Sequence, residues 1–445
     1  MGFINIDIKE LTPAQILATG YMVVILTGTI LLMLPIATAN GNGLNIIDAL
    51  FTSTSATCVT GLIVVNTSSA FTVFGQLVIM ILIQVGGLGI MTMSSLIAFI
   101  LGKKISLKER LIIQEDLSQF NISGMVRLVR YVIGFTFIIE GTGAFLLWFR
   151  LIKEYNFWKA IYYSVFHAVS AFNNAGFDLF GNSLVDFTGD IIINFVIMAL
   201  IILGGIGFGV LVEINNLRNI FDISLQTKIV LAVTIILLII GFFMILGLEF
   251  DNDSTMGNLP IGNKMLSAFF LSVTPRTAGF NTLPTGALRS STLFFIVVLM
   301  FIGASPGSTG GGIKTTTFGV MVITLWNMMT GKRDIEIYNR QLEKEVIFKS
   351  ISITLLALGL VVFVTITLTI TENMEFLSVL FETVSAFGTV GLSTGVTSHL
   401  SDFGRILITI TMFAGRVGPL TLAIAFAERE QKGIYHLPKE KIMVG

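Results

Sequence analysis

Long apolar runs separated by short polar stretches dominate the chain. A helix that crosses a bilayer needs about 20 predominantly apolar residues. Runs of this kind, taken in pairs along the chain, lie at roughly 15–35, 71–101, 128–149, 190–212, 227–248, 291–302 continuing brokenly to 328, 347–370 and 404–427. The pattern therefore predicts eight membrane spans.

A shorter, half-apolar segment lies between the two runs of each pair. These segments read NIIDALFTSTSATCVTG, WKAIYYSVFHAVSAFNNAG, KMLSAFFLSVTPRTAG and EFLSVLFETVSAFGTVG. Each is too short and too polar to cross a bilayer, and each ends in glycine. We expect each to form a short helix that enters the membrane and turns back.

The four terminal glycines reveal an internal repeat. They are Gly61, Gly176, Gly279 and Gly391. A phenylalanine stands ten residues before each of them, at Phe51, Phe166, Phe269 and Phe381, and a leucine or phenylalanine follows each at once. Two fixed offsets in four segments make chance improbable. The repeats are expected at 1–101, 102–212, 213–328 and 329–427, followed by a tail at 428–445.

The distribution of basic residues predicts the orientation of these repeats. Of the 27 lysines and arginines, 18 lie before the first run, in the linkers after each second run, or in the tail. Cytoplasmic loops carry such an excess. Both termini are therefore expected in the cytoplasm, and the repeats should be parallel rather than inverted.

Composition narrows the class of protein. Hydrophobic residues make up 54% of the chain and charged residues only 12%, which predicts an integral membrane protein with several spans. A formal net charge of zero argues against nucleic acid as a partner. The single cysteine, Cys58, excludes an intrachain disulfide. The start of the chain lacks the basic region of a signal peptide. We find no catalytic motif, so the sequence predicts that the protein is not an enzyme.

The glycine turns suggest the chemistry. Non-helical backbone at membrane depth is tolerated only where it is buried in protein or lines a water-filled cavity. Four parallel copies around one axis would line a pore, and glycine accepts the backbone angles that turn carbonyls inward. Rings of carbonyls replace the hydration shell of a cation. The expected fold is thus all-α, with four helix–pore helix–filter loop–helix repeats around a pseudo-four-fold pore.

The sequence TVG at 389–391 is the core of the potassium-channel signature, and the four glycine turns in one chain resemble the Trk/Ktr/HKT superfamily of potassium transporters. Length, tail and the stretch ASPGSTGGGIKT are similar to the membrane subunits of bacterial Ktr systems. The resemblance covers the whole chain and implies a selectivity filter built by Val59, Thr60, Gly61, Asn174, Ala175, Gly176, Thr277, Ala278, Gly279, Thr389, Val390 and Gly391. Only the last turn keeps TVG, which predicts looser selectivity than in a symmetric channel.

The stretch GASPGSTGGGIKTTT, 303–317, interrupts the sixth apolar run. A phosphate-binding P-loop is one alternative, but Ile313 separates the glycine from the lysine and no strand precedes it. A kinked helix packed through small residues is another. The resemblance implies a third, an intramembrane loop at about 304–316 that restricts the pore. Its gate residues would be Ala304, Ser305, Pro306, Gly307, Ser308, Thr309, Gly310, Gly311, Gly312 and Lys314, with Arg416. The sister units carry only QVGGLG, LGGIGFG and AGRVGP there.

Arg416 lies in the last apolar run, where burying a charged side chain in the membrane costs free energy. An arginine at that depth normally faces water or a polar partner. We expect it to bind carbonyls or hydroxyls of the loop; the alternative is that it reaches the cytoplasmic interface. Lys314 either repels ions in the closed pore or reaches cytoplasmic water.

Four further polar residues lie near the glycine turns, and a fifth, Glu140, lies within the third apolar run. Arg276 is expected either to pair with an acidic group, Glu382 being one choice, or to pack structurally. Asn173 and Asn174 either support the second turn or cap its helix. His167 is expected to be a satisfied buried histidine, and Glu140 to be structural.

The resemblance implies potassium translocation across a bacterial plasma membrane through a channel-like pore. A cation-coupled secondary transporter is the alternative, and the membrane subunit of an ATP-driven pump is a third reading. The chain itself should need no cofactor: potassium is the substrate, sodium is a candidate activator, and nucleotide would bind only a partner. The implied partners are a second copy in a homodimer and a cytosolic nucleotide-binding regulatory ring of the KtrA type. The charged linkers 102–130 and 329–349 and the tail are the surfaces available to them.

Overall fold

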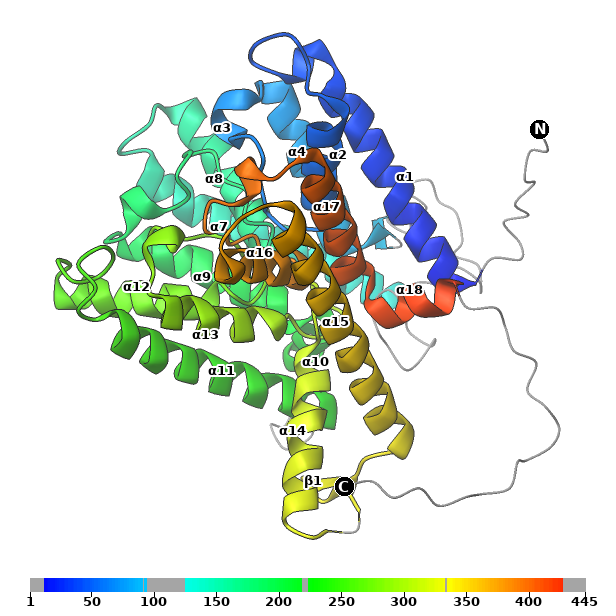
Figure 1. The fold of residues 1–445 in the computed structure, drawn as a ribbon. Helices are drawn as coiled ribbons and strands as arrows, with labels where there is room; N and C mark the ends of the chain where they lie inside the picture. The colour runs from blue at the N-terminus through cyan, green and yellow to red at the C-terminus, as the bar shows by residue number, and fades with distance from the viewer. Residues whose placement is uncertain (1–11, 91, 94–124, 218–222, 333, 427–445) are drawn as a thin grey trace, which may run out of the picture.

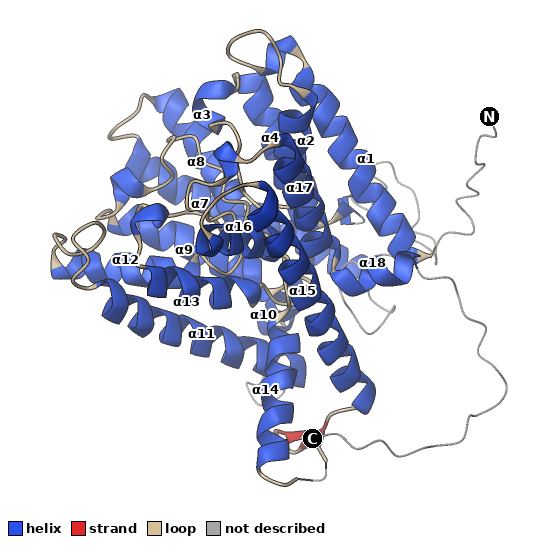
Figure 2. Ribbon diagram, viewed as in Figure 1, coloured by secondary structure: helices blue, strands red, loops and turns tan. Residues whose placement is uncertain are grey.

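Helices account for nearly all regular structure in this computed structural model, which describes residues 12–90, 92–93, 125–217, 223–332 and 334–426 (Figure 2). The longest helices are α1 (Pro13–Met33), α7 (Met125–Leu151), α11 (Leu225–Glu249) and α15 (Lys344–Thr371). Shorter apolar helices are α4 (Val73–Leu88), α9 (Ile191–Ile206), α13 (Ser290–Phe301) and α17 (Asp402–Val417). Very short helical elements are α3 (Thr67–Ala70), η1 (Pro35–Ala37), η2 (Val185–Phe187), η4 (Thr285–Ala287) and η5 (Thr397–His399). The prediction of a helical membrane fold is confirmed.

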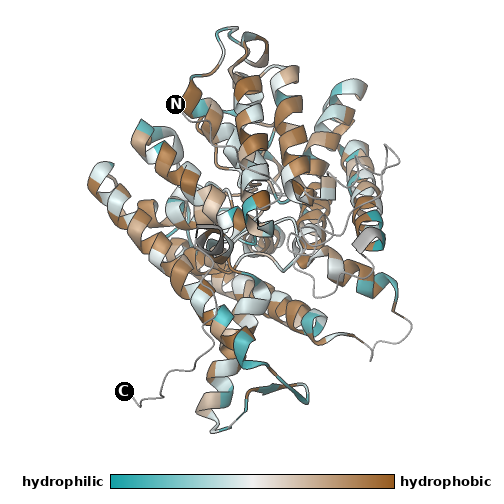
Figure 3. Ribbon diagram, turned by 90° about the vertical axis from the view of Figure 1, so that its right-hand side faces the viewer, coloured by the Kyte–Doolittle hydropathy of each residue, from teal (hydrophilic) through white to brown (hydrophobic). Residues whose placement is uncertain are grey.

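The four longest helices are long and apolar enough to cross a bilayer. Large apolar side chains point outward from them, as at Phe137, Phe243 and Phe363, which are 66%, 65% and 63% exposed. Apolar groups on this scale would be unfavourable in water, and they suit a surface that faces lipid tails. Hydrophobic colour accordingly runs along the helices in Figure 3, while hydrophilic colour collects at the loops and ends.

The four half-apolar segments form the short helices α2 (Ile46–Thr57), α8 (Phe157–Phe172), α12 (Ile261–Val273) and α16 (Phe376–Gly388). Asn45 and Asn156 begin the first two by accepting a hydrogen bond from a main-chain N–H of the first turn. Each short helix also packs against an apolar helix from another part of the chain: α2 on α17, α8 on α4, α12 on α9 and α16 on α13. Because α2 contacts α17, the N-terminal and C-terminal parts of the helical arrangement meet and it closes on itself (Figure 1).

The apolar helices that follow the glycine turns do not continue straight. Chain direction changes at Gly89, Gly207 and Gly418, whose φ angles are 85°, 101° and 95° and whose ψ angles are 140°, 136° and 132°. Residues other than glycine are strained there. The axes of α9 and α10 (Phe208–Asn215) differ by 97°, and α18 (Pro419–Phe426) follows the third break. The sequence prediction singled out one interruption, at 303–317; the structure adds three single-glycine breaks.

A second glycine, three residues before each break, explains why these helices pack so closely. Gly86, Gly204 and Gly415 lie against the carbonyl groups of Thr57, Phe172 and Phe387, at the ends of α2, α8 and α16. A Cβ atom added to any of the three would lie within 2 Å of that carbonyl oxygen. The spacing G-x-x-G therefore combines close helix packing at its first glycine with a helix break at its second.

The fourth interruption, after α13, is longer. Residues 303–314 form an irregular loop before α14 (Thr315–Met329). Then α14 and α15 project side by side from the body and carry a short antiparallel hairpin between them, formed by β1 (Glu336–Ile337) and β2 (Arg340–Gln341) (Figure 1). The described part of linker 329–349 is thus an ordered protrusion.

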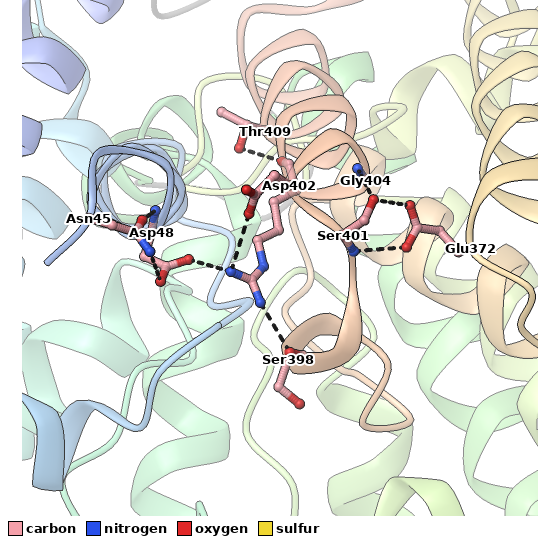
Figure 4. A network of polar contacts seen from close by, with 9 residues as sticks. Asn45, Asp48, Glu372, Ser398, Ser401, Asp402, Gly404 and Thr409 are labelled. Atoms are coloured by element: carbon pink, nitrogen blue, oxygen red, sulfur yellow. Dashed lines mark hydrogen bonds and ion pairs between the residues drawn. The ribbon is translucent and has the colours of Figure 1, made fainter.

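A polar network joins the first short helix to the last apolar helix. Arg405 of α17 forms an ion pair with Asp48 of α2 at 2.8 Å and donates to the Ser398 carbonyl (Figure 4). Nearby, Glu372 accepts hydrogen bonds from the N–H and hydroxyl of Ser401, which begins α17. These contacts fix α17 against helices from both ends of the sequence.

Candidate functional site

The four glycine turns share one unusual backbone conformation. Two residues before each glycine, the backbone is left-handed at Val59, Asn174, Thr277 and Thr389, with φ between 51° and 67°. The glycines Gly61, Gly176, Gly279 and Gly391 also have positive φ, between 70° and 90°. Val and Thr are β-branched and rarely adopt such angles. Strain of this kind persists only where surrounding structure imposes it, and it gathers at functional sites.

The four glycines lie close together and form what we call the glycine ring. A Cβ atom built on Gly61 would lie 2.3 Å from the carbonyl oxygen of Ala175; one on Gly176 would lie 2.8 Å from that of Ala278. One on Gly279 would lie 2.5 Å from that of Val390, and one on Gly391 would lie 2.2 Å from that of Thr60. Each glycine thus touches the residue before the next glycine, and the fourth returns to the first. Only hydrogen fits at these four positions.

Four hydroxyls that the sequence analysis did not single out hold the turns from behind. Ser55, Ser170 and Thr274 each donate to the carbonyl of the residue that follows the nearest ring glycine, at 2.7, 2.7 and 2.5 Å. Ser385 accepts from the Gly391 N–H at 3.1 Å, as Ser55 does from the Gly61 N–H. A hydroxyl stands six residues before the glycine in three segments and five in the other, which is the signal that could have identified them.

Asn174 links two neighbouring turns. Its amide donates to the Arg276 carbonyl at 3.1 Å and to the Thr277 hydroxyl at 3.2 Å. Asn173 instead donates to Gln84, to Glu140 and to the Val169 carbonyl. The hydrogen bonds therefore favour the supporting role for Asn174 and the capping role for Asn173, which ends α8 and donates back to the Val169 carbonyl of that helix.

Two of the other predictions on polar residues have clear outcomes. His167 is buried: its Nδ1 lies 2.6 Å from the Tyr163 carbonyl, and its Nε2 accepts from the Leu179 N–H. The suggested pairing of Arg276 with Glu382 is wrong. Glu382 accepts hydrogen bonds from Ser393 and Thr397, which follow the fourth glycine turn. The one side-chain hydrogen bond described for Arg276 goes to Thr234, at 3.5 Å.

Loop 303–314 lies directly against the glycine turns. The Gly311 N–H donates to the Thr389 hydroxyl at 2.9 Å, and Gly310 lies so close to Thr277 that an added Cβ would overlap its hydroxyl oxygen. Thr277 and Thr389 are the left-handed residues of the third and fourth turns. The predicted loop residues therefore reach two of the predicted filter segments.

The base of the loop is closed and its tip is held by several elements. The Gly303 N–H donates to the Ile313 carbonyl at 2.8 Å, which pins the two ends together. The main-chain N–H groups of Ser305, near the base, and Thr309, near the tip, donate to the carbonyls of Gly205 and Gly204 in α9. The Lys314 ammonium turns back to the Gly310 carbonyl at 2.7 Å. The loop is thus anchored mostly through main-chain groups, which small residues leave accessible.

Arg416 binds the loop and the first part of the chain together. Its guanidinium donates to the Thr309 carbonyl in the loop and to the Gly86 carbonyl at the end of α4. It also lies 3.3 Å from the Gly87 carbonyl and from the Tyr21 hydroxyl. The expected contact with loop carbonyls is present; the contacts with α4 and with Tyr21 of α1 were not anticipated.

A cavity of about 120 Å³ borders the same loop. Gly307, Ser308, Gly310 and Lys314 line it together with Arg416 and Tyr21, among other residues. Gly310 contacts Thr277 of the third turn as well as this cavity. Gly310 therefore lies between the third glycine turn and a cavity that polar and apolar residues both line.

The chain matches the TrkH family model, described as cation transport protein, over residues 5–436. It is 46% identical over 434 residues to Ktr system potassium uptake protein B of Bacillus subtilis, covering 98% of this chain and 97% of that protein. It is 38% identical over 443 residues to potassium/sodium uptake protein NtpJ of Enterococcus hirae, covering 98% of both chains.

A solved structure has a similar fold. The crystal structure of the potassium transporter TrkH from Vibrio parahaemolyticus aligns with a TM-score of 0.70 and 17% identity, covering 92% of this chain and 85% of that one.

Proposed function

This chain belongs to the TrkH family of cation transport proteins, and on that basis we propose that it carries potassium ions across the cell membrane through a channel-like pore. The observation that supports this most directly is the glycine ring. Four strained turns bring main-chain carbonyls together at one place, as a site that replaces the water around a monovalent cation requires. The names of the relatives, which are potassium and potassium/sodium uptake proteins, support the choice of ion.

The filter in this proposal consists of the three residues at each turn, ending in Gly61, Gly176, Gly279 and Gly391. Hydroxyls of Ser55, Ser170, Thr274 and Ser385 would hold the turns at a fixed radius. Thr60, Ala175, Ala278 and Val390 differ in size from one turn to the next, which is consistent with imperfect discrimination between potassium and sodium.

The gate in this proposal is loop 303–314. The loop lies between the glycine turns and the cavity of about 120 Å³, and a barrier to ions would be effective at that position. Arg416 would hold the loop in its closed position, because it hydrogen-bonds the loop and α4 at once. Lys314 and Arg416 would add positive charge on the path of a cation.

Four repeats around the pore form the proposed architecture, over 1–101, 102–212, 213–328 and 329–427. Support comes from the order of elements, since a long helix, a short helix, a glycine turn and an apolar helix recur in each. Eight spans result if each broken apolar helix is counted as one crossing.

The proposed partners are a second copy of the chain and a cytosolic regulatory ring that binds nucleotide. The hairpin at the end of α14 and α15 is a suitable contact surface because it projects from the body. Most of linker 102–130 and the tail from 427 onward lie outside the described residues.

A flux assay in liposomes tests the proposed function. Purified protein should pass potassium and rubidium faster than sodium, and the flux should follow the electrochemical gradient with weak saturation. Steep saturation together with an obligatory opposing gradient of sodium or protons would favour the cation-coupled secondary transporter instead.

Both termini and the hairpin are expected on the cytoplasmic side. In a Cys58→Ser background, Lys332→Cys, in the linker before the hairpin, should react with a membrane-impermeant thiol reagent only from the cytoplasm. Asn258→Cys, between α11 and α12, should react only from outside; both positions are exposed. Labelling of both from one side would contradict the orientation proposed for the third repeat.

A further inference from the structure

A buried arginine stands beside the third glycine turn without an acidic partner. Arg276 is 8% exposed and immediately precedes the left-handed residue Thr277. Among the described residues it forms no ion pair, and its Nη1 nitrogen is buried without a hydrogen-bond partner. Its Nη2 lies 3.5 Å from the Thr234 hydroxyl, at the long limit of a hydrogen bond. A guanidinium does not lose its proton in proteins, so this is a buried charge that is incompletely solvated.

A cavity of about 10 Å³ adjoins this side chain. Arg276 and Thr234 line it with Ala304, Gly205 and three isoleucines of α9, namely Ile201, Ile202 and Ile206. Its size suits one water molecule. Its lining is mostly apolar, so a water there would need one side chain that donates to it and one that accepts from it. The unpartnered Nη1 and the Thr234 hydroxyl supply such groups.

The same cavity connects the third turn to the base of the loop. Ala304 is the second residue of loop 303–314, and the next residue, Ser305, donates to the Gly205 carbonyl at 3.0 Å. If the loop moves away, Ala304 leaves the cavity wall and the guanidinium gains access to pore water. If the loop returns, it covers the charge again.

We propose that Arg276, together with one water molecule bound between its guanidinium and Thr234, sets the balance between the closed and open positions of loop 303–314. This inference rests on the proposed gate. Burying a charge with too few hydrogen bonds disfavours the closed position. The bound water reduces that cost without removing it, so the loop remains ready to open.

Two substitutions should act in opposite directions. Arg276→Met keeps the approximate length of the side chain and removes its charge. The closed position of the loop should then be more populated, and potassium flux in liposomes should fall about tenfold. Thr234→Val keeps the shape and removes the hydroxyl, so the guanidinium loses a partner and flux should rise. Arg276→Lys keeps the charge and should stay near the parent value, which a role in packing alone would not predict.

The decisive comparison repeats Arg276→Met in a chain that lacks Gly307–Gly312. If the arginine acts through the loop, the substitution should have no further effect there. An equal loss of flux in both backgrounds, or no loss in either, would overturn the inference. If the deletion itself does not raise flux, the proposed gate fails; if it does while Arg276→Met acts unchanged, only the present inference fails.

The ligand can be tested separately by experimental density. A water-sized peak within hydrogen-bond distance of Arg276 Nη1 and the Thr234 hydroxyl is the expected result. An anomalous peak at that position in crystals grown with bromide would show that the site binds an anion, and it would overturn the assignment of a water molecule.

Discussion

Removal of Gly307–Gly312 should raise potassium flux through the reconstituted protein by about tenfold or more, because the closed pore would lose its barrier. The structure suggests that the fold tolerates this deletion. The Gly303 N–H and the Ile313 carbonyl pin the base of the loop at 2.8 Å, so the shortened chain can still turn there. The removed residues include Gly310 and Gly311, which contact the third and fourth glycine turns.

The deletion should leave the preference for potassium over sodium largely intact, since the glycine turns are also held from behind by their hydroxyls. Radioactive rubidium uptake into liposomes measures the flux, and size-exclusion chromatography checks the assembly. Arg416→Ala should change flux in the same direction but less, because it removes one set of contacts to the loop.

Arg405→Ala provides a matched control for the Arg416 substitution. Arg405 lies on the same helix, α17, but forms its ion pair with Asp48 on α2. Its loss should lower stability and leave the dependence of flux on the loop unchanged.

Two outcomes of the Gly307–Gly312 deletion would contradict the gate. Abolished flux in folded deletion protein would indicate that the loop conducts ions, and unchanged flux would indicate that the loop only packs.

Replacing a ring glycine by serine should cause the largest loss of selectivity. Each glycine has positive φ, and an added Cβ would overlap a carbonyl oxygen of the next turn. Backbone strain alone costs on the order of 1–3 kcal/mol at such positions. We expect the ratio of potassium to sodium flux to fall about tenfold or more, since one carbonyl moved out of place degrades the whole ring.

The four positions should not respond equally. The added Cβ would lie 2.2 Å from an oxygen at Gly391, 2.3 Å at Gly61, 2.5 Å at Gly279 and 2.8 Å at Gly176, so Gly176→Ser should be mildest. Gly359→Ser is a suitable control, because this glycine lies within α15 with nothing within 4 Å of its Cβ position. Unchanged selectivity in all four ring variants would refute the filter.

The sequence predicted the glycine turns well because two signals coincide at each. A ring glycine must be glycine for steric reasons, and a phenylalanine that is buried in the structure precedes it by ten residues at Phe51, Phe166 and Phe381. The interpretation of Arg416 succeeded for a similar reason, since a charge in an apolar helix requires polar partners, and carbonyls of the loop and of α4 supply them.

Other features were not evident from sequence because their signals are ambiguous. The breaks at Gly89, Gly207 and Gly418 occur in glycine pairs that equally suit straight, closely packed helices. The supporting hydroxyls are hidden among many serines and threonines, and the shift from six residues to five at Thr274 obscures the pattern. The pairing of Arg276 with Glu382 failed because Glu382 accepts from two hydroxyls just after its own glycine turn, at Ser393 and Thr397.

The ion pair between Arg405 and Asp48 has a consequence for how the ring can come apart. Successive units are joined by the polypeptide, but the fourth meets the first across a seam that no peptide bond spans. Contacts between α2 and α17 and this ion pair close it. Mechanical or thermal opening of the ring should therefore begin at the seam. A circular permutant that connects the fourth unit to the first would move that weak point to whichever junction receives the new termini.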